Sequence, residues 1–436
     1  MSKKESPTCI YENERVVFKS YISEFTPDLY KEFDLKAEKI GLQSKINDLF
    51  NGKKVNFTEG LAAWHTKYRN EYIPDEFNTS LGHKKETELF EMFHDAKNII
   101  AIGIGGSYEG PKLLRWNEDI NYVFITGSDP DEFRSKTSKL NPEDTIIFVS
   151  SKSFTTDETI ATLKDAISWS GAMDRFIAIT SNKVEAEKFG INNIIEFDQE
   201  IGGRYSIWSD ISIIAKWSSP EDFDDFMAGG KQADIDLKKD HSYQKFVKNL
   251  SYSDIWLHNY KNKNSRAILS YIWWIKTFPD YAQQLEMESL GKQPSKDSEF
   301  KKTGQIIFGG YGPRAQHSYF QLLHQGTQDI CVDIIADSYS SKANPETLAY
   351  AQAITQSKLL STGAKDLLKA EERINGNTPT NLFLFKCLGA YEIGYLVATW
   401  EHRTYITAAM LGINPFDQFG VNAGKIYTKK YLADKN

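Results

Sequence analysis

Residues 98–197 alternate short runs of β-branched and aromatic residues with amphipathic stretches. Runs that are apolar on both faces are typical of strands buried in a parallel sheet, and the stretches between them are typical of crossover helices. The five predicted strands are 98–104, 121–126, 145–150, 175–180 and 193–197. A helix is predicted over 156–168, with Thr155 and Glu158 as a capping box at its start. The alternation restricts this part of the chain to an α/β fold.

A second, less regular alternation begins near Ala267. Its predicted strands are 267–271, 305–309, 330–336 and 381–385. Its predicted helices are 272–288, 345–360 and 388–411, and Gly412 ends the last of them. A chain of 436 residues exceeds the size at which one hydrophobic core keeps growing, so we expect two α/β domains.

The expected domain boundaries follow from these two alternations. We expect the first α/β domain over 91–235, a connecting segment over 236–265 and the second α/β domain over 266–415. Residues 1–90 are polar and mostly helical in pattern, and we expect them to pack on the first domain. A C-terminal helix that carries Lys425 is expected over 416–436.

Charge and cysteine content exclude several classes of protein. A formal net charge of -7 and a pI near 5.7 argue against a nucleic-acid partner, since such proteins need a basic face. The three cysteines are scattered and lack metal or redox spacing, which favours a reducing compartment. Residues 1–18 lack the apolar core of a signal peptide, and no run of 18 apolar residues could span a bilayer. We therefore expect a cytoplasmic protein with no membrane partner.

Two loops that follow predicted strands carry residue types that bind anions. Gly103–Gly110 reads GIGGSYEG, and its glycines allow backbone N–H groups to approach a ligand. Because Tyr108 stands where GxGxxG needs its third glycine, the turn is no dinucleotide site, and a ligand-free tight turn is the alternative. Ser151–Thr156 gathers four hydroxyls and Lys152 where a helix begins, which favours a phosphate site. The alternative is that one hydroxyl caps the helix and the others are solvated.

Further positions are candidates for acid-base or electrostatic chemistry. Arg204 follows two glycines, so its guanidinium could stabilise an oxyanion, although a surface arginine after a flexible turn is the simpler interpretation. Gln284 and Glu288 lie four apart on one helix face, where a carboxylate could act as a general base. On spacing alone, Glu286 is an equal candidate, and a solvated helix surface would explain all three residues.

Two histidines and a lysine remain open on the residues alone. His317 and His324 are seven apart, which places both on nearly the same side of a predicted helix. Metal ligation is one interpretation, but no carboxylate or thiol stands nearby at ligand spacing, so hydrogen-bonded structural histidines are the simpler one. Lys425 could be a catalytic or substrate-binding cation, although a lysine near the C-terminus is ordinarily solvated.

Six of these segments resemble signature regions of the glucose-6-phosphate isomerase family, in the same order, from residue 101 to 425. GIGGSYEGPKLL resembles the family's first glycine turn, SKSFTTDETI its phosphate loop and GGRYSIWS its arginine segment. QQLEMESLGK resembles its base segment, AQHSYFQLLHQGT its histidine segment and FDQFGVNAGK its C-terminal signature. The resemblance implies two sugar-isomerase (SIS) type α/β/α sandwich domains, each with a central mainly parallel sheet, and a homodimer with shared active sites.

The resemblance also implies interconversion of glucose 6-phosphate and fructose 6-phosphate, in glycolysis and gluconeogenesis, with no metal or organic cofactor. Glu288 would move a proton between C1 and C2 through a cis-enediol, and Arg204 would stabilise the enediolate. Lys425 and His317 would assist ring opening, with His317 reaching in from the partner subunit. The residues that would contact the hexose phosphate are Gly106, Ser107, Ser151, Lys152, Ser153, Thr156, Gln284 and Gln418.

The chain departs from the family's pattern at three places. Leu290 replaces an asparagine after the base segment, and Asn422 replaces a glutamate before the C-terminal lysine. The family's turn with its glutamate is replaced by Gly309–Ala315, which contains Arg314 and leads to His317. An isomerase of altered or broadened specificity, accepting for example mannose 6-phosphate, is therefore one alternative. A non-catalytic sugar-phosphate-binding regulator is another.

Overall fold

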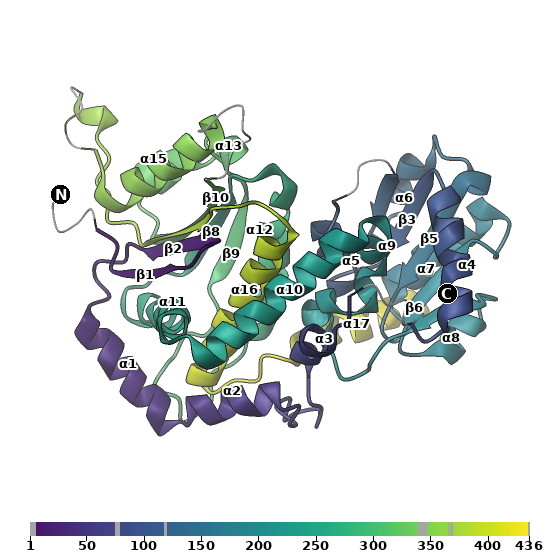
Figure 1. The fold of residues 1–436 in the computed structure, drawn as a ribbon, viewed down its shortest axis with the longest axis horizontal. Helices are drawn as coiled ribbons and strands as arrows, with labels where there is room; N and C mark the ends of the chain where they lie inside the picture. Colours follow the sequence, from purple (N-terminus) through teal and green to yellow (C-terminus); the bar gives the residue numbers. More distant parts are fainter. Residues whose placement is uncertain are drawn as a thin grey trace.

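The computed structural model describes residues 6–434, except 75–78, 117–119, 339–346, 365, 367 and 368. Its strands form two sheets in two α/β units that lie side by side (Figure 1). The first sheet has five parallel strands in the order β4-β3-β5-β6-β7. Their bounds are β3 Asn98–Ile102, β4 Asn121–Ile125, β5 Thr145–Ser150, β6 Phe176–Thr180 and β7 Asn193–Glu196. The five strands predicted in this region are confirmed.

The first sheet is the middle layer of an α/β/α sandwich. Successive residues of β5 face opposite layers: Phe148 packs with Phe93 and Trp217, whereas Val149 belongs to the cluster of Leu163. Full burial of one such side chain stabilises the fold by roughly 1.5–3 kcal/mol. The covering helices are α4 His83–Asp95, α5 Gly106–Leu113, α6 Pro130–Thr137, α7 Asp157–Ser170, α8 Lys183–Glu187 and α9 Ile213–Ser218.

The strand order places a topological switch point, here called the crevice, at the carboxyl ends of β3 and β5. After β3 the chain forms β4 on one side and then returns to form β5 on the other, so the connections that follow β3 and β5 diverge. Ligands of open α/β sheets bind at such a switch point. The glycine turn follows β3 and the hydroxyl-rich loop follows β5, so both predicted anion-binding loops lie at this crevice.

The second sheet has six strands in the order β1-β2-β11-β10-β8-β9. Their bounds are β1 Cys9–Glu12, β2 Val16–Ser20, β8 Ser265–Ser270, β9 Ile306–Tyr311, β10 Ile330–Asp337 and β11 Thr380–Phe385. The strands β8 to β11 pair in parallel and confirm the four predicted ones. The helices of this unit include α10 Pro220–Lys239, α11 His241–Tyr260, α12 Phe278–Leu290, α15 Leu348–Thr362 and α16 Ala390–Leu411. The predicted helix start at Pro345 lies outside the described residues.

The N-terminal segment corrects a prediction. Residues 1–90 are expected to be mostly helical and to pack on the first domain. This is confirmed for α4, which covers the first sheet, but β1 and β2 extend the second sheet as antiparallel strands. Phe18 of β2 lies opposite Phe383 of β11, with ring centroids 5.1 Å apart. The helices α1 Pro27–Lys39 and α2 Leu42–Phe50 also pack on the second unit. Two strands this short give no clear period, and their partner is distant in the chain, so local patterning cannot reveal the pairing.

Residues 236–265, expected to connect the domains, contain all of α11, which packs on β1 and α16. The helix α10 lies against α16 and extends toward the first unit (Figure 1). Glycines allow this close crossing: a Cβ on Gly229 would lie 1.9 Å from the carbonyl oxygen of Tyr391, and one on Gly394 would lie 1.9 Å from that of Phe226. In the part of the chain that is described, no helix is long and apolar enough to cross a membrane.

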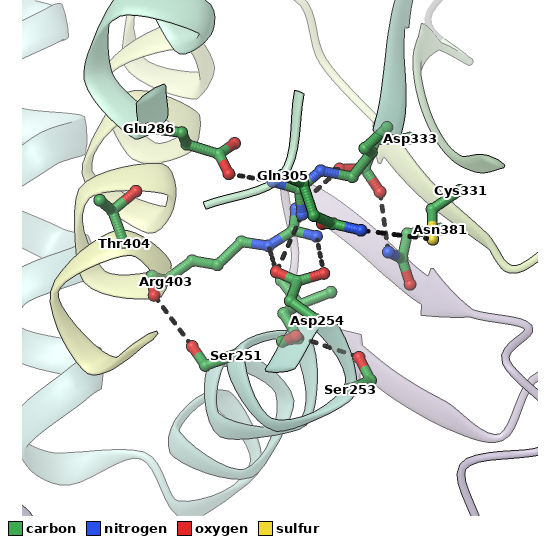
Figure 2. A network of polar contacts seen from close by, with 12 residues as sticks. Ser251, Ser253, Asp254, Glu286, Gln305, Cys331, Asp333, Asn381, Arg403 and Thr404 are labelled. Atoms are coloured by element: carbon green, nitrogen blue, oxygen red, sulfur yellow. Dashed lines mark hydrogen bonds and ion pairs between the residues drawn. The ribbon is translucent and has the colours of Figure 1, made fainter. Parts of the chain in front are cut away.

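A buried ionic network holds α12 on the second sheet (Figure 2). Arg403 of α16 donates to Asp254 of α11 and to Asp333 of β10, each at 2.7 Å. Arg266 of β8 donates to Asp254 at 2.8 Å and to Glu286 of α12. Removing one member of a buried pair leaves an uncompensated charge and costs about 3–5 kcal/mol. The network therefore fixes which face of α12 turns inward.

Candidate active site

Two glycines after β3 bring the first unit close to α12 and to the loop after β7. Gly105 has φ +59, and a Cβ there would lie 2.8 Å from Gln284 Nε2. A Cβ on Gly106 would lie 1.8 Å from the carbonyl oxygen of Gly203. Because no side chain fits between these segments, they meet at the crevice, next to Ser107 in the first turn of α5.

The loop between β5 and α7 holds its hydroxyls through bonds within the loop. Ser151 Oγ accepts from the backbone N–H of Phe154 at 3.2 Å and lies 3.1 Å from Thr156 Oγ1. Thr155 Oγ1 donates to Ser153 Oγ at 2.8 Å. Phe154 has φ 52, a left-handed conformation that costs roughly 1–2 kcal/mol outside glycine, and its side chain is buried. Strain of this kind clusters at ligand sites, where the surrounding structure imposes it.

The start of α7 is suited to a phosphate. The predicted capping box is wrong, because the N-cap is Thr156 and its side chain makes no capping bond. The first N–H groups of a helix lack partners within the helix, and together with the helix dipole they attract anions. Lys152 donates to the carbonyl oxygen of Ile201 at 3.0 Å, and burial lowers its pKa. This loop therefore supplies hydroxyls, N–H groups and one cation at the crevice.

Arg204 is the centre of the polar contacts between the two units. Its side chain is 1% exposed, so the surface-arginine interpretation is wrong. Its hydrogen-bond acceptors are Glu288 Oε2 at 3.1 Å, Gln418 Oε1 at 2.9 Å, Ser289 Oγ at 2.9 Å and the carbonyl oxygens of Pro415 and Asp417. A guanidinium held in this way cannot reorient, and a fixed charge in a dry site stabilises developing negative charge more strongly than in water.

The two carboxylates near the end of α12 have different surroundings. Glu286 is buried, pairs with Arg266 and accepts from Trp400 Nε1 at 2.7 Å. The Glu288 side chain is 35% exposed, and its Oε2 accepts from Gln284 Nε2 at 3.4 Å as well as from the central arginine. Of the two, Glu288 has the access to the crevice that a general base needs.

The C-terminal helix α17 Asn422–Ala433 extends from the central arginine to the start of α7. Gln418, just before this helix, accepts from the arginine. Lys429 Nζ lies 3.4 Å from Asp157 Oδ1 in the first turn of α7. Lys425 stands one turn earlier on the same helix face, about 6 Å along the axis, and is exposed. Lys425 therefore lies on the helix between these two groups of contacts.

His317 lies at the opposite end of β9 from Glu288. The last turn of α12 reaches the start of β9, where a Cβ on Gly304 would lie 3.0 Å from the carbonyl carbon of Leu290. His317 is exposed and follows the far end of β9, next to Gln316, which accepts from Tyr271 Oη at 2.8 Å. A strand rises about 3.3 Å per residue, so β9 separates these ends by about 17 Å. The structure therefore does not bring His317 to the other candidate residues of its own chain.

The prediction that His317 and His324 share one helix face is wrong. The short helix α13 Gly312–Ala315 ends before His317, and a separate helix, α14 Phe320–Gln325, carries His324. His324 Nε2 lies 2.7 Å from Gln356 Oε1. Within the described residues, no group of three His, Cys, Asp or Glu side chains could hold a metal ion.

Comparison with known proteins identifies the family. The model of the phosphoglucose isomerase family matches residues 89–436. A glucose-6-phosphate isomerase of Ectopseudomonas mendocina is 33% identical over an alignment of 449 positions, which covers 89% of this chain and 80% of that protein. The chain belongs to the phosphoglucose isomerase family. Its arginine, base and C-terminal segments all fall inside the matched region.

Solved structures confirm the predicted fold class. The glucose-6-phosphate isomerase from Chlamydia trachomatis has a TM-score of 0.84 at 23% identity, covering 98% of this chain and 90% of that one. Tagatose-6-phosphate ketose/aldose isomerase from Escherichia coli has a TM-score of 0.51 at 11% identity, covering 82% and 91%. Two sandwiches with mainly parallel sheets are thus the architecture of this member of the phosphoglucose isomerase family.

Three residues that support the site, Ser289, Tyr205 and Lys292, were not predicted from the sequence. Ser289 Oγ accepts from Arg204 and lies 3.1 Å from Tyr205 Oη, so it helps to hold the guanidinium in place. Lys292 Nζ lies 2.8 Å from Asp417 Oδ1 and holds the segment before Gln418, and burial lowers its pKa. The available signal was position, since Ser289 directly follows Glu288, Tyr205 directly follows Arg204, and Lys292 stands four residues after Glu288.

The structure shows the surroundings of two departures from the family pattern, Leu290 and the turn that contains Arg314. Leu290 is buried in the core beneath α12, where an apolar side chain packs without needing a polar partner. Gly310 has φ 149, and a Cβ there would lie 3.7 Å from Arg314 Nη2. The altered turn therefore belongs to the His317 end of β9, far from Glu288 of the same chain.

Proposed function

We propose that this chain interconverts glucose 6-phosphate and fructose 6-phosphate, with Glu288 as the general base. One observation carries the assignment: a partly exposed carboxylate lies 3.1 Å from the buried guanidinium of Arg204 at the crevice between the two units. Membership of the phosphoglucose isomerase family supports the same reaction. The base and the charge that its reaction requires therefore stand side by side.

The proposed chemistry is a proton transfer on the open-chain sugar. Glu288 takes the proton from C2 of glucose 6-phosphate, and that electron pair forms the C1–C2 double bond of a cis-enediol. The negative charge that develops on the carbonyl oxygen O1 is stabilised by Arg204, and a proton passes from O2 to O1. The protonated carboxyl group of Glu288 then delivers its proton to C1, which leaves the carbonyl at C2 as in fructose 6-phosphate.

Both groups are needed because a C–H next to a carbonyl is a weak acid. A positioned general base typically supplies about 10²- to 10⁴-fold. Fixed charges aimed at the developing oxyanion often supply a larger factor, because they need no reorganisation during the reaction. The bonds from Arg204 to two backbone carbonyls and to Ser289 hold its charge in this way.

We further propose that the sugar phosphate binds at the start of α7. The hydroxyls of the loop, the free N–H groups and Lys152 form one anion site there. The proposed phosphate contacts are Gly106, Ser107, Ser151, Lys152, Ser153 and Thr156. Gln284 and Gln418 flank the base and the guanidinium, so they are assigned to the sugar hydroxyls. Lys425, one turn from the contact of α17 with α7, is assigned to ring opening.

We infer that the working unit is a homodimer in which the partner subunit's His317 completes the site. Within one chain, about 17 Å of β9 separates the two ends that carry His317 and Glu288. One hexose cannot contact both ends. The exposed apolar side chains of α17, including Ile426 and Tyr427, support the burial of this region against a second copy. A cytoplasmic location fits the three free cysteines.

Turnover of purified protein on a panel of sugar phosphates tests this function. Fructose 6-phosphate should be converted to glucose 6-phosphate, detected through a coupled glucose-6-phosphate dehydrogenase. Equal turnover of mannose 6-phosphate would favour altered specificity, and the altered turn with Gly310 and Arg314 is the structural reason to test it. Tight binding of fructose 6-phosphate without turnover would overturn the proposal in favour of a regulator.

A further inference from the structure

A second cavity lies between the two units, away from the crevice. It has a volume of about 600 Å³, within the range of pockets that enclose small organic ligands. The first unit contributes residues of α5, β4 and α6, and the second contributes the turn η4 Trp273–Ile275 and the start of α12. β4 is the edge strand of the first sheet, paired only with β3 among the described strands.

The charge of this cavity is opposite to that of the chain. Four cations line it, namely Lys112, Arg115, Lys136 and Lys276, and none of the described residues that line it is an Asp or a Glu. The whole chain has 52 basic and 59 acidic residues, so a group of described lining residues that includes four cations and no carboxylate is unusual for it. Clustered cations of this kind attract anions and suit phosphate groups.

Carboxylates outside the cavity partly neutralise Lys112 and Lys136. Lys112 pairs with Asp280 at 3.4 Å, and Lys136 pairs with Glu132 at 2.7 Å. Arg115 has no ion pair within the described residues and lies over the ring of Tyr122, 5.5 Å from its centroid. Its planar fork can bind a phosphate through two parallel hydrogen bonds. Arg115 is therefore the main candidate for an anion contact.

Aromatic rings form the other part of the wall. Trp273 and Trp274 are 53% and 43% exposed, although tryptophan side chains are usually well buried. Lys276 Nζ lies 3.6 Å from the centroid of the Trp273 ring and covers one face of it. Tyr108 adds a third ring from α5. Exposed indoles next to cations are the combination that binds a planar base joined to phosphates.

We propose that this cavity binds a nucleotide, with its base against Trp274 and its phosphates on Arg115 and the neighbouring lysines. The site is separate from the sugar-phosphate crevice. Gly106 of the crevice begins α5, whereas Lys112 lies about 9 Å further along the same helix. On α12, Thr277 and Glu288 are about 16 Å apart. Sugar phosphate and nucleotide therefore bind together without displacing each other.

Calorimetric titration of the full chain with Mg-ATP tests the site. The titration is done with saturating fructose 6-phosphate, which occupies the phosphate loop of the crevice. We expect saturable binding with one site per chain, and weaker binding of adenosine alone or tripolyphosphate alone, because the site uses ring and phosphates together. Arg115→Gln and Trp274→Ala should each weaken binding about tenfold, since stacking of one base or loss of one charged pair has that effect.

Matched variants separate this site from the crevice. Arg115→Gln and Trp274→Ala should keep the basal isomerase rate, which shows that they fold, because neither residue touches the crevice. Lys152→Ala should weaken fructose 6-phosphate binding and leave Mg-ATP binding unchanged. The proposal is overturned by absence of binding, by equal binding of wild type and both cavity variants, or by loss of binding in Lys152→Ala.

Discussion

Glu286 and Glu288 stand two residues apart on α12 and have opposite surroundings. Glu286 is enclosed by Arg266 and Trp400 in the core, whereas Glu288 is partly exposed beside Arg204. The buried network on one face of the helix thus determines which carboxylate reaches the crevice. Glu286 anchors α12 in the core and thereby fixes the position of Glu288.

Glu286→Gln should destabilise the protein without removing its chemistry. The variant weakens the charged hydrogen bond from Arg266, which still pairs with Asp254, and we expect the free energy of unfolding to fall by about 1–3 kcal/mol. Urea unfolding followed by circular dichroism measures this. Turnover per folded molecule should stay close to that of the wild type. Unchanged stability together with lost turnover would mean that Glu286, and not Glu288, is the base.

Arg204→Lys should lose turnover although the positive charge remains. An ammonium cannot reproduce the fork that bonds Glu288, Ser289 and the backbone carbonyls at once. Loss of one oxyanion-stabilising group typically costs about 10²- to 10³-fold in kcat. Steady-state kinetics with fructose 6-phosphate should show this fall mainly in kcat. A change in KM alone would assign Arg204 to substrate binding.

Mixed dimers test whether the active site is shared. Glu288→Gln and His317→Gln are each expected to be inactive as homodimers. When differently tagged chains are refolded together, about half of the dimers are mixed, and each mixed dimer has one site with both native residues, which predicts recovery of about a quarter of wild-type activity. If His317 served its own chain, no mixed dimer would contain an intact site, and mixing would restore nothing.

His65 should make the fold sensitive to acid. It lies at the start of α3 His65–Glu71, is buried, and its ring is 4.6 Å from that of Tyr205. Burial lowers its pKa to about 3, with the charge of Arg69 adding to the effect. The unfolded chain binds a proton on His65 near pH 6.5, whereas the folded chain does not. The contribution of neutral His65 to stability is therefore present above pH 6.5 and is lost as pH falls toward 3.

Comparison with His65→Gln isolates this contribution. Glu401, whose pKa burial raises to about 7, acts in the opposite direction, because it contributes stability at low pH that is lost as pH rises through 7. Both chains retain Glu401. The unfolding free energy of the wild type should therefore fall more steeply below pH 6.5, by about 1.4 kcal/mol per pH unit at most. Parallel curves would show that His65 does not titrate differently in the two states.

The parallel strands of both sheets could be predicted because each is a buried apolar run between helical stretches. The strands β1 and β2 could not, since β2 pairs with β11, and only a tertiary contact reveals that pairing. The switch point between β3 and β5 follows from strand order, which sequence patterning does not give. Local propensity thus predicted the elements, while the sheet edges depended on long-range packing.

The candidate site shows the same division. Spacing left Glu286 and Glu288 equal, and only the buried pair with Arg266 separates them. From the sequence, a surface position is the simpler interpretation of Arg204. Its hydrogen bonds to the segment 415–418 instead join parts of the chain more than 200 residues apart. The family resemblance pointed to both residues, because it reflects the assembled site and not the local pattern.

The rate of fructose 6-phosphate isomerisation by the wild type and by Glu288→Gln is the most direct test of the central claim. The wild type should turn over, and the variant should lose about 10²- to 10⁴-fold in kcat. Its unfolding free energy should fall, because Glu288 is the carboxylate that pairs with the buried Arg204, so turnover is compared per folded molecule. Wild-type turnover in a folded Glu288→Gln variant would contradict the assignment of Glu288 as the base.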